Sequence, residues 1–112
     1  MSESSSLSTF LQERRARIAP ETLGLPPPRR RSRPGLRRED VAELVDVTLY
    51  WYGLFESGTS GRRFSAAFLT RLADVLGLDD ADRVTLLRLA SATGALPRDV
   101  ELLGRQLAHA LA

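Results

Sequence analysis

The side chains in this sequence with the clearest chemistry are arginines that stand in three groups. All sixteen basic residues are arginine. A guanidinium group is planar, stays charged at physiological pH and offers paired N–H donors that match the oxygens of a phosphate. Codon usage in a GC-rich genome favours arginine as well, so the argument depends on where the arginines stand. The three groups predict a phosphate-binding surface formed by Arg29, Arg30, Arg31 and Arg33, by Arg37 and Arg38, and by Arg62 and Arg63.

The positive charge lies mainly before residue 39. Residues 1–38 hold nine arginines against three acids, a balance of +6, whereas residues 39–112 hold seven arginines against eleven acids, a balance of −4. Five of the six prolines fall in residues 19–35, which therefore cannot form a continuous helix. This insert is either a solvated connector or a basic arm that lies along phosphates or enters a minor groove. The neighbouring elements favour the arm.

Residues 37–58 are predicted to position the arginines as two short helices joined by a tight turn. The first helix is expected to begin near residue 36 and run to about residue 45, and the second covers about 48–56. Asp46 falls in the turn, where a positive φ is needed, Thr48 is a suitable N-cap, and Gly58 ends the unit. The apolar residues face a common core: Val41, Ala42, Leu44, Val45, Trp51, Tyr52 and Phe55. This pattern is typical of a helix-turn-helix.

Three further helices are predicted to complete the core. One covers residues 7–18, and the others begin after the caps Ser65 and Asp79. The last of these is expected to bury Val84, Leu86, Leu87, Leu89 and Ala90. The predicted fold class is all-α, a five-helix bundle with an additional C-terminal helix that begins at Pro97.

The domain organisation follows from these elements. Residues 1–6 are predicted to form a disordered tail and residues 7–92 the helix-turn-helix domain, with the Pro/Arg-rich insert at 19–35. Residues 93–112 carry the C-terminal helix, whose apolar stripe is Val100, Leu103, Leu107 and Leu111. That stripe either folds back on the preceding helix or pairs with its copy in a homodimer. Alternatively, the segment links to a further domain of a longer protein.

Several function classes find no support in the sequence. It has no cysteine and a single histidine, His109, so no metal site is expected. We find no nucleophile with a nearby base and no Gly-rich phosphate loop, so neither an enzyme nor a bound cofactor is predicted. No apolar run approaches the roughly 20 residues of a membrane span. A cytoplasmic, nucleoid-associated protein is expected.

Three stretches carry a family resemblance: LRREDVAEL at 36–44, the Glu56-x-Gly58 pair, and FSAAFLTRLADVLGLDDADRVTLLRLA at 64–90. Together with the Pro/Arg-rich insert, they resemble the DNA-binding domain of the MmyB-like branch of the Xre family of bacterial regulators, over about residues 7–90. The resemblance implies a lambda-repressor-like fold, transcriptional control and, usually, a PAS-like sensor domain that follows. Residues 97–112 are similar to the region that leads into that domain.

The side chains predicted to face base edges are Thr48, Leu49, Tyr50, Gly53 and Leu54. Relatives commonly have polar or basic residues at several of these positions, often arginine in place of Leu54, and glycine in place of Asp46. None of the five can make the bidentate contacts by which arginine selects guanine, or asparagine and glutamine select adenine. We expect weak direct readout, with Leu49 able to touch a thymine methyl and the arginines able to sense minor-groove width.

Two functions from different classes remain open. The first is a sequence-specific regulator that binds double-stranded DNA through residues 48–56, with the arginine groups on phosphates or in the minor groove. The second is a degenerate helix-turn-helix that binds a protein partner. Its docking surface would be the apolar outer face of the same helix, formed by Leu49, Tyr50, Gly53 and Leu54.

Overall fold

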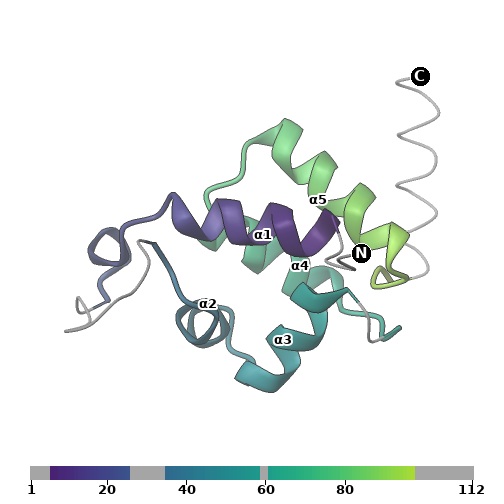
Figure 1. Cartoon of the computed structure of the whole chain (residues 1–112), viewed down its shortest axis with the longest axis horizontal. Coiled ribbons are helices and arrows are strands. Elements are labelled where there is room, and N and C mark those ends of the chain that lie inside the picture. Colours follow the sequence, from purple (N-terminus) through teal and green to yellow (C-terminus); the bar gives the residue numbers. More distant parts are fainter. Residues whose placement is uncertain (1–5, 26–34, 59–60, 98–112) are drawn as a thin grey trace.

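A computed structural model describes residues 6–25, 35–58 and 61–97 of the chain (Figure 1). This part is all-helical and contains no strand. Its elements are α1 (Ser6–Ala16), the short 3-10 helix η1 (Pro20–Leu23), α2 (Arg38–Leu44), α3 (Leu49–Ser57), α4 (Ala66–Val75) and α5 (Asp80–Ala92). The predicted class, an all-α bundle that contains a helix-turn-helix, is confirmed for these residues. The predicted C-terminal helix and its dimer contact lie outside them.

Three helices begin at the caps that the sequence predicts. The side-chain oxygens of Thr48, Ser65 and Asp79 accept hydrogen bonds from backbone N–H groups three residues later, at 3.0, 3.1 and 2.8 Å. Each such cap satisfies a donor that the helix itself cannot satisfy and contributes about 1 kcal/mol. The starts of α3, α4 and α5 are therefore fixed by local chemistry.

The turn between α2 and α3 has the conformation that the sequence predicts. Asp46 adopts a φ of 62°, and no other non-glycine residue of the described ranges has a positive φ. Aspartate tolerates this region better than most residues do. At the far end of α3, Gly58 has a φ of 69° and forms the C-cap. The helix-turn-helix thus begins and ends close to its predicted bounds.

All five helices contribute to the core; α1 and α2 pack on α3, and α5 packs on α1 (Figure 1). Phe55 packs edge-on against Phe64 and Phe68, with ring centroids 5.0 Å apart in both pairs. After α5, the backbone returns to this cluster, because the N–H of Phe64 donates to the carbonyl of Ala95 at 2.7 Å.

The prediction that Val84 is buried is wrong, since 46% of this residue is exposed. The helical period of α5 was right, but its buried stripe is centred on Leu86 and Ala90.

The N-terminal region differs from its predicted bounds by a few residues. Ser6, which the sequence assigned to the tail, is already part of α1, and α1 ends at Ala16, before Ile18. Gly35, at the end of the insert, has a φ of 90° and packs so closely on the backbone of Arg15 and Ala16 that a Cβ would overlap it. Leu36 and Arg15 then exchange two hydrogen bonds, of 2.9 and 3.0 Å. The chain therefore enters α2 from a fixed point on α1.

Candidate nucleic-acid interface

The inner face of α3 is completely buried. Tyr52, Phe55 and Glu56 expose 0–1% of their surface. Aliphatic and aromatic side chains of the neighbouring helices cover the first two, which is what an amphipathic helix requires. Glu56 is different, because a buried carboxylate is costly unless cations and donors surround it.

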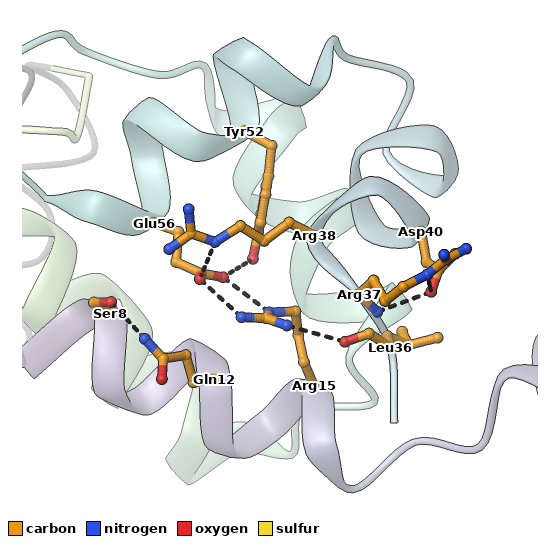
Figure 2. Close-up of polar contacts among 9 residues, drawn as sticks. All are labelled: Ser8, Gln12, Arg15, Leu36, Arg37, Arg38, Asp40, Tyr52 and Glu56. Atoms are coloured by element: carbon orange, nitrogen blue, oxygen red, sulfur yellow. Dashed lines mark hydrogen bonds and ion pairs between the residues drawn. The ribbon is translucent and has the colours of Figure 1, made fainter. Parts of the chain in front are cut away.

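Glu56 is surrounded by donors from three helices (Figure 2). Its Oε1 accepts from Nε of Arg15 at 3.0 Å and from the Tyr52 hydroxyl at 2.8 Å. Its Oε2 accepts from Nη2 of Arg15 at 2.9 Å and from Nε of Arg38 at 2.7 Å. These four bonds use the full acceptor capacity of a carboxylate. One buried group thus ties α1, α2 and α3 together, and we call Arg15, Arg38, Tyr52 and Glu56 the carboxylate cluster.

The electrostatics of the carboxylate cluster leave a surplus cation at the surface. Burial raises the pKa of the Tyr52 hydroxyl well above 10.0, and the neighbouring Glu56 carboxylate raises it further. Burial lowers the pKa of Arg15, but the hydrogen bonds and charge of Glu56 outweigh this effect and raise it overall. Two guanidinium groups against one carboxylate leave a charge of +1. This charge is nearest to solvent at Arg38, whose side chain is 42% exposed, compared with 14% for Arg15.

The first arginine pair, Arg37 and Arg38, has partners within the chain. Cations at a helix N-terminus oppose its dipole, which by itself would point to an external anion. The structure supplies internal acids instead: the backbone N–H of Arg37 donates to Oδ2 of Asp40 at 2.8 Å, its Nη2 lies 3.2 Å from Oδ1, and Arg38 bonds Glu56. Their position is therefore explained without an external anion. Arg38 bonds Glu56 through Nε, and 42% of its side chain remains exposed.

The second pair, Arg62 and Arg63, lies between α3 and α4. The guanidinium carbon of Arg62 is 5.9 Å from the ring centroid of Trp51 on α3, within cation–π range. Nη1 of Arg63 donates to the carbonyl of Leu96 at 2.6 Å. Both residues are largely exposed, and Arg62 is held beside α3. The third group, Arg29, Arg30, Arg31 and Arg33, lies outside the described residues.

The outer face of α3 carries the residues predicted to face base edges. Leu49 is 49% exposed and Tyr50 is 73% exposed, so both are available to a partner. Thr48 is exposed, but its hydroxyl oxygen already caps the helix. Leu54 is half-buried and packs partly against the core, so it offers less surface than Leu49 or Tyr50.

Gly53 stands on this face in the interior of α3. A Cβ built at Gly53 meets no atom within 4 Å, and the residue has no positive φ. Nothing in the described part of the chain therefore requires a glycine here. Glycine in a helix interior costs roughly 1 kcal/mol relative to alanine.

The carboxylate cluster is what sequence reasoning missed. Glu56 entered only as half of a family motif, although it stands four residues after Tyr52 and thus on the buried stripe of α3. The signal that could have revealed the cluster was an acidic residue on an otherwise apolar helix face.

Over residues 6–25, 35–58 and 61–97, no three His, Cys, Asp or Glu residues gather to hold a metal ion. No helix of these ranges has the length and apolar composition to span a bilayer.

Comparison with known proteins identifies the domain. A family model described as a helix-turn-helix domain matches residues 28–86, which is more than half of the chain. The match begins in the insert and includes α2, α3, α4 and the first half of α5. Neither curated proteins nor solved structures give a match.

Proposed function

The chain belongs to the helix-turn-helix domain family, and on this basis we propose that it is a bacterial transcriptional regulator that binds double-stranded DNA with α3 in the major groove. Within that family we assign it to the MmyB-like branch of the Xre regulators. It acts in the cytoplasm, on the nucleoid, without a cofactor and without enzymatic activity. The observation that carries the proposal is the contrast between the buried inner face and the exposed outer face of α3, with arginines beside it.

The arginines are proposed to bind phosphates on both sides of α3. Arg38 is the best-supported candidate, because Glu56 holds its Nε at 2.7 Å while 42% of its side chain stays exposed. A guanidinium group that is already ordered loses little side-chain entropy when it binds a phosphate. Further contacts are assigned to Arg37, Arg62 and Arg63, and to the arm formed by Arg29, Arg30, Arg31 and Arg33.

A homodimer through residues 93–112 would place two copies of α3 on successive half-sites. In helix-turn-helix dimers the half-sites lie one helical turn apart, about 34 Å, or a multiple of it. The apolar stripe of that segment supports this arrangement. The same segment could instead lead to a sensor domain or contact α5.

Salt dependence tests the proposed phosphate contacts. With about six phosphates neutralised, a plot of log binding constant against log salt concentration is expected to have a slope of about −5. Arg38→Gln should make the slope less steep by about 1, whereas Arg88→Gln, at an exposed arginine of α5, should leave it unchanged. Duplex binding that does not weaken as salt rises would rule out this mechanism.

A second candidate function is favoured by the apolar character of Leu49 and Tyr50. These side chains could dock on a protein partner, so that the fold is kept without base recognition. This function requires a tight protein complex that Leu54→Arg abolishes, together with no sequence preference among duplexes. Sequence-selective duplex binding would decide against it.

A further inference from the structure

The outer face of α3 has an unusually exposed apolar edge. Four large hydrophobic residues of the described ranges are exposed: Leu23, Leu49, Tyr50 and Val84. Only Leu49 and Tyr50 are adjacent, and both lie in the first turn of α3. In a helix-turn-helix, this end of the second helix contacts base edges. An apolar edge therefore stands at the end of the helix that contacts base edges in this motif.

The partner of this edge is constrained by its surroundings. Arg62 lies beside Trp51 of α3, and Arg38, the first residue of α2, extends its partly exposed guanidinium group to Glu56 of α3. The apolar edge formed by Leu49 and Tyr50, with Arg38 and Arg62 nearby, is complementary to a surface that has an apolar patch bordered by anionic groups. The major groove has this character, because phosphates border it and the thymine C5-methyl is the apolar group that base edges present there.

Gly53 adds an independent observation. It lies one turn after Leu49 on the same face, where a helix surface brings residues i and i+4 together. The absence of a side chain lets a partner approach the backbone of α3 closely, and no contact inside the described part explains the glycine.

We propose that α3 recognises thymine by its methyl group, with Leu49 and Tyr50 as the specificity-determining residues and Gly53 as the residue that admits the base edge. This inference rests on the proposed DNA-binding function and names the bases that the domain selects. The operator should contain thymines opposite the first turn of α3, because neither side chain can make a bidentate contact with guanine or adenine.

Replacing thymine by uracil tests the inference, since this change removes only the methyl group. A duplex obtained by selection from random sequences is bound by the full chain, with either thymine or uracil at every position. The uracil duplex is expected to bind about fourfold more weakly for each methyl in contact. Leu49→Ser should weaken binding of the thymine duplex and reduce the discrimination by about fourfold, the effect of one methyl contact. Val84→Ser is the matched control, since Val84 is exposed to a similar extent on α5 and its substitution should preserve the discrimination.

The outcomes separate this inference from the proposed function. Equal affinity of the wild-type chain for the thymine and uracil duplexes would overturn methyl recognition while DNA binding stands. Discrimination that Leu49→Ser leaves undiminished would overturn the assignment to Leu49. Failure to bind any duplex would overturn the proposed function itself, and a protein that binds the wild-type chain but not Leu49→Ser would then favour the second candidate function.

Gly53→Ala tests the close approach separately. Alanine is the better helix former, so the thermal midpoint is expected to rise by about 4 °C. Affinity for both duplexes should fall, because the added methyl occupies the space that the base edge needs. A Gly53→Ala variant that is more stable and binds as tightly as the wild type would show that no base edge needs the space beside Gly53.

Discussion

The two faces of α3 differ in how completely their side chains are buried and bonded within the chain. On the inner face, the carboxylate of Glu56 has all its acceptor positions filled, and Tyr52 and Phe55 are buried. On the outer face, Leu49 and Tyr50 are exposed, and Gly53 stands in open space. The inner face therefore holds the helix in place whatever the outer face binds. This separation lets one fold present different recognition residues.

The largest expected effect comes from removing the charge of the inner face. Glu56→Gln leaves the guanidinium groups of Arg15 and Arg38 without their common counter-ion. Removing one partner of a buried ion pair is expected to lower the free energy of unfolding by about 3–5 kcal/mol. Urea unfolding measures this loss.

Glu43→Gln is the matched control, since Glu43 is an exposed acid on α2. Its substitution should change the free energy of unfolding by no more than about 0.5 kcal/mol. A Glu56→Gln chain that is as stable as the control would mean that the carboxylate cluster does not hold the three helices together.

A smaller effect is expected from Tyr52→Phe, which removes one of the four donors to Glu56. The expected loss at pH 7 is about 1–2 kcal/mol. The difference should shrink in alkaline solution. Because burial raises the pKa of Tyr52 above its unfolded value of about 10, this hydroxyl contributes fully below pH 10, and its contribution falls as the pH rises beyond that value.

Unfolding of both chains at pH 7 and pH 11 measures this linkage. The wild-type chain should lose more stability between the two pH values than Tyr52→Phe does. Equal losses would indicate that Tyr52 releases its proton as readily in the folded chain as in the unfolded one.

The smallest effect on stability is expected on the outer face. Leu49→Ser and Tyr50→Ser should each change the free energy of unfolding by about 0.5 kcal/mol or less, because 49% of Leu49 and 73% of Tyr50 are already exposed. A loss comparable to that of Tyr52→Phe would show that the outer face also supports the fold. The contrast between the two faces would then not hold.

Local signals in the sequence predicted most of the helix-turn-helix. Thr48, Ser65 and Asp79 were assigned as caps, and Asp46 was placed in the turn, because each of these roles depends on one residue type within a few positions of its partner. Arg15 and Glu56, by contrast, stand 41 residues apart. No local pattern pairs them, so the carboxylate cluster became visible only in the fold. The error at Val84 arose because helical periodicity predicts the spacing of buried residues well, but it predicts less precisely which residues at the edge of the apolar face are buried.

The assignment of base-facing and phosphate-binding residues stays a prediction. The structure shows that Leu49 and Tyr50 are exposed and that Arg37, Arg38, Arg62 and Arg63 have partners or close neighbours within the chain. Sequence patterns predict individual DNA contacts only by resemblance to a family, because the DNA itself is not part of the chain. The arm from Arg29 to Arg33 lies outside the described residues.

Selection from a pool of random duplexes at two salt concentrations tests the central claim, that the outer face of α3 binds DNA with sequence preference, most directly. We predict that the chain retains duplexes with a common thymine-containing motif at both concentrations, and that it retains less DNA at the higher one. Retention of no duplex at low salt, or of duplexes without a shared sequence, would contradict the claim.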